Sequence, residues 1–241
     1  MALCEKIIPY MNELKLGPIL IRNRFLISIY NFVENRLGIK EILDLEVFYK
    51  LAPSYLGIFS CFGGITFFMF ILQVVTGILL LVYYIPTTAQ AYDSVVHITN
   101  NVPFGWLIRG IHHWGANIMI ITVFIHMGKI YFYGIYKNPR ELNWVTGIIL
   151  LTCTLSFSFT GYLLPWTQLS YWATVVGTEI PSAVPVAGEY IKIFLRGGAD
   201  VSQITLTRFF AVHIMVLPAA VVMFIVLHII MIRRQGISGP L

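Results

Sequence analysis

Charged side chains are scarce in this sequence. Asp, Glu, Lys and Arg make up 11% of its 241 residues, and hydrophobic residues make up 58%. Soluble domains carry a charge on about a quarter of their residues, so an ordinary soluble enzyme is excluded. Each membrane-spanning helix takes about 20 apolar residues, so a chain of this length accommodates roughly four to six spans. The composition therefore predicts one integral membrane protein.

Cysteine is scarce as well, with Cys4, Cys61 and Cys153 as the three examples. Three scattered cysteines do not build a disulfide framework, and the CxxCH haem-attachment motif is absent. A cleavable signal peptide is also missing, because charges interrupt the first 50 residues and no small-residue cleavage site follows an apolar core. The first spanning helix is therefore expected to direct insertion by itself.

Four long apolar runs are present, and prolines or charges punctuate their ends. We predict spanning helices over about 56–84, 105–134, 142–164 and 208–232. The predicted fold is all-α, a four-helix transmembrane bundle over 51–241 preceded by an N-terminal extension over 1–50. The extension contains the amphipathic tract IYNFVENRLGIKEIL, which predicts a helix lying on the membrane interface. The segment from Pro165 to Thr207 is expected to be a long surface connection.

Basic residues predict the orientation. With both termini and the loop between the second and third spans on one side, that side carries 12 Lys and Arg residues against 4 on the other. Such an excess marks the cytoplasmic, or n, side, so both termini are predicted to face it. The net charge of +5 is then a matter of orientation, and no nucleic-acid partner is expected.

Four of the six histidines lie inside predicted spans, where an ionisable group is costly and marks a functional site by default. His112 and His126 are 14 residues apart in the second span, so they share one helix face about 21 Å apart. His213 and His228 are 15 residues apart in the fourth span, which leaves about 60° of mismatch. Pro218 lies between them, and a proline kink can absorb part of that mismatch.

If the second and fourth spans face each other, these residues form two His–His pairs at two membrane depths. Two imidazoles without a nearby carboxylate or thiolate suit the axial positions of a six-coordinate haem iron. Zinc fits less well, because structural zinc takes four ligands in one cluster. Hydrogen bonding of each histidine to a neighbouring helix is the structural alternative.

Glycines repeat the histidine spacing. Gly63 and Gly77 in the first span, and Gly147 and Gly161 in the third, are each 14 residues apart. A porphyrin is wide and flat, so helices beside it must lack side chains at its depth. Close helix packing is the ordinary role of glycines in spans, but it does not account for two matching intervals.

Further polar residues lie near these depths. Arg109, one turn before His112, and Arg140, in the loop before the third span, are placed to pair with haem propionates. Interfacial snorkelling is the alternative for both arginines. His113 points about 100° away from His112, so it is a polar or propionate neighbour, and His97 is expected to be a solvated loop residue.

Several segments together resemble one family: IRGIHHWGAN with HMGKI after it, KNPRELNWVTG, FTGYLLPW, LTRFFAVH and MIRRQGISGPL. From about Ile29 to Leu241 the chain resembles the cytochrome b6 subunit of cytochrome b6f complexes and of the split cytochrome bc complexes of bacteria. The resemblance implies a subunit of a quinol:cytochrome c oxidoreductase, or of one with a plastocyanin-type acceptor. Respiratory and photosynthetic complexes both remain open, in the bacterial cytoplasmic membrane or the thylakoid.

The resemblance also implies particular cofactors. His112 and His213 would hold the low-potential b haem near the p side, and His126 and His228 the high-potential b haem near the n side. Cys61, in SCFGGITFF, would attach a c-type haem through one thioether. Electrons would cross through these groups in a Q cycle coupled to proton translocation, with quinone as substrate. Arg233, with Asp44 or Glu46, would belong to the n-side region of quinone binding and proton uptake.

The resemblance implies a dimeric complex in membrane lipid with a Rieske iron–sulfur protein and a c-type cytochrome. The sequence PEWY is absent from this chain, so a separate partner like subunit IV would carry it. This chain alone is therefore not expected to oxidise quinol. Thr167 stands where plant-type members usually have an acid, so proton handling or partner contact at that position is open.

Two other functions are alternatives. A di-haem membrane anchor of a dehydrogenase or hydrogenase also uses histidines on four or five helices, but the paired glycines and the QGISGPL ending argue against it. A haem-free transporter with a histidine proton relay would have no b-type absorption spectrum.

Overall fold

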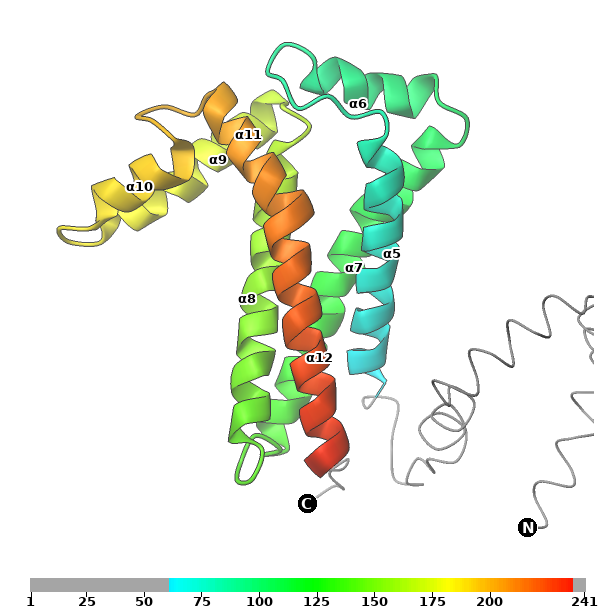
Figure 1. The fold of residues 1–241 in the computed structure, drawn as a ribbon, viewed down its shortest axis with the longest axis vertical. Helices are drawn as coiled ribbons and strands as arrows, with labels where there is room; N and C mark the ends of the chain where they lie inside the picture. The colour runs from blue at the N-terminus through cyan, green and yellow to red at the C-terminus, as the bar shows by residue number, and fades with distance from the viewer. Residues whose placement is uncertain (1–60, 236–241) are drawn as a thin grey trace, which may run out of the picture. The chain divides into compact units, whose positions relative to one another are not determined.

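The computed structural model describes residues 61–235, with side chains through residue 232. Every regular element in this part of the chain is helical. The long helices are α5 (Phe62–Leu81), α7 (Gly105–Phe132), α8 (Glu141–Leu163) and α12 (Leu217–Gln235) (Figure 1). Helix α12 is preceded without a break by α11 (Gln203–Ala211) and the π-helical segment η4 (Val212–Val216). Four of the helical stretches are long and apolar enough to cross a membrane, with lengths of 20, 28, 23 and 30 residues.

These four stretches confirm the predicted all-α integral membrane fold. The interfacial helix predicted within residues 1–50 lies outside the described residues. In Figure 1 the long helices run side by side, and the short helices α6, α9, α10 and α11 gather at the upper end of the bundle. The turn between α7 and α8 lies at the lower end, together with the start of α5.

The helices pack as two pairs. The backbone of α5 lies closely along α7, and that of α12 lies along α8, with a smaller contact between α7 and α8. The helices α7 and α12 are not among the closely packed pairs of the described chain. The direct face-to-face packing that the sequence analysis assumed for these two helices is therefore not what the structure shows. Each packs along another helix, α7 along α5 and α12 along α8.

An apolar cluster fills the middle of the bundle. Its buried members are Phe70 on α5, Met119 on α7 and Val221 on α12, and residues of α8 such as Leu150 and Phe157 pack against them. Phe70 and Met119 are the midpoints of the 14-residue glycine and histidine intervals of α5 and α7. The four helices therefore meet in an apolar layer halfway between the two histidine depths.

The fourth span contains a turn that the sequence analysis did not predict. Residues Val212–Val216, which include His213, are π-helical, and the N–H of Leu217 donates to the carbonyl of Val212, five residues back. A π turn accommodates one extra residue, so the 15-residue interval covers about the rotation of 14 α-helical residues. His213 and His228 therefore have nearly the same angular relation as His112 and His126. The π turn ends two residues before Pro218, whose missing N–H leaves the α-helical ladder incomplete there.

The connection predicted as a surface segment is itself helical, in α9 (Gln168–Glu179), the short η3 (Ile180–Ala183) and α10 (Gly188–Arg196). Thr167 begins α9 with a capping box, accepting from the N–H of Ser170 while the Ser170 hydroxyl accepts from the N–H of Thr167. Gly197 ends α10 at a φ of 82°, which glycine adopts without strain. A further helix, α6 (Ala91–Asn100), connects α5 to α7.

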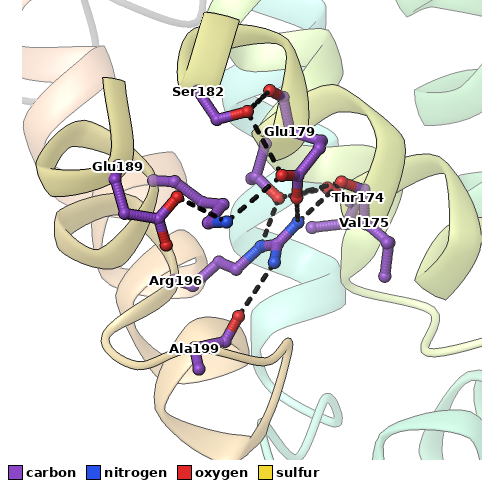
Figure 2. Close-up of polar contacts among 9 residues, drawn as sticks. Thr174, Val175, Glu179, Ser182, Glu189, Arg196 and Ala199 are labelled. Carbon is purple, nitrogen blue, oxygen red and sulfur yellow. Dashed lines mark hydrogen bonds and ion pairs between the residues drawn. The ribbon is translucent and has the colours of Figure 1, made fainter. Parts of the chain in front are cut away.

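Buried Arg196 holds this helical connection together (Figure 2). Its guanidinium donates to the hydroxyl of Thr178 at 2.7 Å, to the carbonyls of Val175 and Ala199, and to the carboxylate of Glu179 at 2.8 Å. These partners come from α9 and from the segment after α10. From the sequence, Arg196 was only one of the basic residues of its side, whereas in the structure four hydrogen bonds from one guanidinium tie the segments to each other.

Candidate functional site

The four intramembrane histidines form two groups at two heights in the bundle. The upper site contains His112 of α7 and His213 of η4, and the lower site contains His126 of α7 and His228 of α12. Within each site the two rings are near enough to interact electrostatically. The structure therefore brings together the same two pairs that the sequence spacing predicts.

Each of the four histidines faces one of the four spaced glycines. A Cβ at Gly161 would lie 2.6 Å from Cε1 of His213, and a Cβ at Gly63 would lie 3.0 Å from Cε1 of His126. The corresponding distances are 3.4 Å from Gly77 to His112 and 3.7 Å from Gly147 to His228.

The upper site thus takes one glycine from α5 and one from α8, and so does the lower site. Gly64, next to Gly63, has nothing within 4 Å of its Cβ position, so the contact belongs to the spaced glycines and not to glycine in general. A side chain at Gly161 or Gly63 would displace the imidazole that lies against it.

Threonine hydroxyls hold three of the imidazoles by Nδ1. The distances to Oγ1 are 2.8 Å from His112 to Thr76, 3.1 Å from His213 to Thr160 and 3.1 Å from His228 to Thr146. Each threonine directly precedes one of the spaced glycines in the sequence. The glycine gives the ring room, and the threonine beside it supplies the hydrogen-bond partner.

These contacts favour one tautomer of the imidazole. Each of the three hydroxyls donates its proton to a carbonyl of its own helix, as Thr76 does to Leu72 at 2.7 Å. When the hydroxyl donates to that carbonyl, its oxygen is left to accept from Nδ1–H of the histidine. Nε2 of His112, His213 and His228 is then the unprotonated nitrogen, the form in which imidazole binds a metal.

The donor set matches an axial pair and not a metal cluster. Within residues 61–235 no group of three or more His, Cys, Asp or Glu side chains could hold a metal ion. Two imidazoles at each height, glycines where a flat ring needs room, and an apolar layer between the sites fit a b-type haem at each height. The residues present therefore fit the group that the sequence analysis inferred.

The two arginines predicted near propionates lie on different helices. Arg109 is near the start of α7, and Arg140 is at the start of α8. Arg109 is exposed on α7, three residues before His112, and its guanidinium donates to Thr99 at 3.4 Å. Arg140 is the N-cap residue of α8 and is half-buried.

The other two histidines lie outside both sites. His113 is exposed, with its ring edge-to-face against Trp114. His97 is exposed too, but it belongs to helix α6 and not to the loop that the sequence predicted.

Cys61 is exposed and free, directly before α5 and two residues before Gly63 of the lower site. Its side chain does not cap the helix. The remaining predicted site residues lie outside what the structure describes. They are Asp44 and Glu46, and, for its side chain, Arg233.

Comparisons with known proteins agree with this arrangement. The family described as Cytochrome b/b6/petB matches residues 47–236. Cytochrome b6 of Auxenochlorella protothecoides is 48% identical over 214 residues, which make up 89% of this chain and 99% of the relative. Cytochrome b6 of Gloeobacter violaceus is 47% identical with the same coverage. The chain belongs to the cytochrome b/b6 family.

A solved chain of a hyperthermophilic respiratory Complex III superimposes with a TM-score of 0.80 at 33% identity. The match covers 87% of this chain and 56% of the solved one, so the present chain corresponds to about half of that longer protein. As a cytochrome b6-type chain, the protein is a subunit of a quinol-oxidising complex of the bc and b6f type. Membership of the cytochrome b/b6 family implies haem b binding.

The three threonines were not predicted from the sequence, although a repeated dipeptide marks them. The dipeptide Thr-Gly occurs at Thr76-Gly77, Thr146-Gly147 and Thr160-Gly161, at three of the four glycines that were singled out. In this fold a residue one position before a ring-facing glycine lies near the edge of that ring. A polar side chain repeated there was the available indication of a hydrogen bond.

Proposed function

We propose that this chain carries electrons across the membrane through two b haems, with His112 and His213 as one axial pair and His126 and His228 as the other. The observation that carries this proposal is the repeated contact of one histidine with one spaced glycine, four times over, at two heights. The free Nε2 of three of these histidines supports it. When bound, haem supplies a one-electron carrier at each height.

The chain's own residues position and insulate these sites. The glycines leave room beside each imidazole, and the threonines orient three of the rings. Phe70, Met119 and Val221 form the apolar layer that keeps the region between the sites dry. A dry, low-dielectric surrounding is one of the factors by which a protein determines the potential of such a site. Arg109 and Arg140 are proposed to pair with propionates of the upper and lower sites.

A third haem is proposed at the lower end, attached to Cys61 through one thioether. The support is positional: the thiol is exposed and free and lies two residues before Gly63, which faces His126. Such a group would lie next to the lower site. Arg233 with Asp44 or Glu46 is proposed to serve quinone binding and proton uptake on that same side.

The proposed setting is a dimeric complex that runs a Q cycle coupled to proton translocation. Its proposed partners are a subunit IV-like protein with the PEWY sequence, a Rieske iron–sulfur protein and a c-type cytochrome. Both termini are proposed to face the n side, in a bacterial cytoplasmic membrane or a thylakoid. The upper site then lies toward the p side, where quinol is oxidised with the partner subunit's residues.

The pairing is tested by counting b haems in the purified complex from pyridine haemochrome spectra. Single alanine variants of His112 or His213 should lose one and the same haem, and variants of His126 or His228 the other. The double variant H112A/H213A should lose no more than either single variant, because both residues serve one site. The double variant H112A/H126A should lose both. His97→Ala, an exposed histidine of α6, is the control and should keep both haems.

Loss of one haem in H112A/H126A, or of both in H112A/H213A, would contradict the pairing. A wild-type complex without haem would refute the proposed function altogether.

A further inference from the structure

The hydrogen bonds from threonine are distributed unequally between the two sites. In the upper site both imidazoles have one, His112 from Nδ1 to Thr76 and His213 from Nδ1 to Thr160. In the lower site His228 bonds to Thr146, whereas His126 forms no hydrogen bond among the described residues. The upper site thus has two such bonds and the lower site one.

The difference follows from the sequence. Gly77, Gly147 and Gly161 each follow a threonine, but Gly63, which faces His126, follows Phe62. The nearest threonine hydroxyls at that height are engaged elsewhere. Thr66 bonds to the carbonyl of Phe62 and to Thr122, and Thr122 donates to the carbonyl of Met119.

A hydrogen bond from Nδ1–H changes what the other nitrogen does. As Nδ1–H donates to an oxygen, the ring gains electron density and Nε2 becomes a more basic ligand. A more basic axial ligand stabilises ferric iron relative to ferrous iron and so lowers the reduction potential. In all three contacts the threonine hydroxyl also has a carbonyl of its own helix within hydrogen-bond distance, which favours its oxygen as the acceptor from Nδ1–H.

We propose that Thr76 and Thr160 are positioning residues that lower the reduction potential of the upper site relative to the lower site. Two polarised imidazoles act on the upper iron and one on the lower iron. This inference rests on the proposed function, since it requires haem at both heights. It adds a physical origin for the difference between the two potentials in residues that touch neither the iron nor the substrate.

The test is a redox titration of the purified complex, followed in the b-haem absorption bands. The bands are assigned to the sites with the histidine variants described above. Thr76→Val and Thr160→Val keep the shape of the side chain and remove the hydroxyl oxygen beside Nδ1. Each should raise the midpoint potential of the upper site and leave that of the lower site unchanged, and T76V/T160V should raise it further. Thr146→Val should raise the lower midpoint only.

Two controls separate this effect from packing. Thr154 is buried on α8 and donates to the carbonyl of Leu150 with no histidine partner, so Thr154→Val should shift neither midpoint. Thr76→Ser restores the hydroxyl and should restore the wild-type upper midpoint. A threonine with a purely structural role would make Thr76→Ser and Thr76→Val differ in stability but not in potential.

The inference would be overturned if the midpoint potential of the upper site shifts no more in T76V/T160V than in T154V while both haems are present. The proposed function would then remain intact. A shift in the opposite direction would overturn it as well. If Thr76→Val prevents assembly, Thr160→Val and Thr146→Val test the same contact on α8. Absence of b haem from the wild-type complex would instead refute the proposed function.

Discussion

Gly161 of α8 lies against the ring of His213, so closely that a Cβ on the glycine would stand 2.6 Å from Cε1. Real Cβ atoms essentially never approach a neighbour below 3.0 Å. The histidine would have to move, and its Nε2 atom with it. The missing side chain of one glycine therefore determines where the imidazole of His213 lies.

Gly161→Ala is expected to reduce occupancy of the upper haem site. The added methyl must displace His213, and overpacking of this kind costs about 1–3 kcal/mol. Gly63→Ala should act in the same way on the lower site, where the distance is 3.0 Å. Haem content per complex measures both. Gly64→Ala is the matched control, with open space at its Cβ, and equal losses in all three variants would contradict the role of the ring contact.

Removing one residue should have opposite effects in the two histidine helices. Deletion of exposed Met215 from the π turn should leave a regular α-helix in which His213 and His228 are still in phase, because the interval becomes 14 residues. Deletion of exposed Ile121 from α7 shortens the His112–His126 interval to 13 and rotates one histidine by about 100°. Two b haems are expected after the first deletion and fewer after the second. The reverse order would show that the π turn does not set the phase.

Cys61→Ala should abolish haem that remains on this subunit after denaturing electrophoresis, as detected by peroxidase staining. Covalent attachment needs an accessible thiol, and Cys61 is exposed at the start of α5. Cys153→Ala, at a half-buried position within α8, should retain the stain. The two extractable b haems should be unaffected in both variants. Staining that persists in the Cys61 variant would remove this residue from the site.

The contacts around Glu179 predict a pH-dependent contribution to stability. Hydrogen bonding from Lys192 lowers the pKa of the Glu179 carboxyl, with further bonds from Ser182 and Arg196. A carboxyl whose pKa is lower in the folded protein stabilises the fold above its unfolded pKa of about 4.3, and this stabilisation is lost as the pH falls through the folded value. Thermal unfolding midpoints of the wild type and Glu179→Gln should therefore differ at neutral pH and converge in acid.

Glu189→Gln is the control for that experiment, because Glu189 pairs with Lys192 but does not contact Arg196. Exposed pairs of this kind contribute little, so its unfolding midpoint at neutral pH should lie nearer the wild type. A difference between the wild type and Glu179→Gln that is constant from neutral to acid pH would contradict the role of the ionised carboxylate.

Much of this site could be predicted from spacing. A helix repeats its direction after about 14 residues, so His112 and His126, like Gly63 and Gly77, reveal a shared face without any knowledge of tertiary structure. The spans were equally predictable, because an apolar run of about 20 residues matches the thickness of the hydrocarbon core. Pairing across helices needed the further assumption that two spans face each other.

Other features depend on contacts that no local pattern encodes. At His213 the same residues could form either α-helical or π-helical backbone hydrogen bonds, and the sequence does not distinguish the two. Pro218 indicated only the region in which the helix is irregular. Arg196 looks like any basic residue of a loop until four partners from two segments surround it. The helices α9 and α10 were not predicted because they are short, contain glycine and charges and are separated by prolines.

The apolar layer around Phe70 also determines how the sites respond to voltage. The two histidine heights are about 21 Å apart along α7, in a hydrocarbon core about 30 Å thick. An elementary charge that crosses a whole membrane held at 100 mV gains or loses about 2.3 kcal/mol, so passage between the sites accounts for about 1.6 kcal/mol. In the proposed function, electron transfer between the two sites therefore moves charge across most of the bilayer, and the membrane potential acts on it directly.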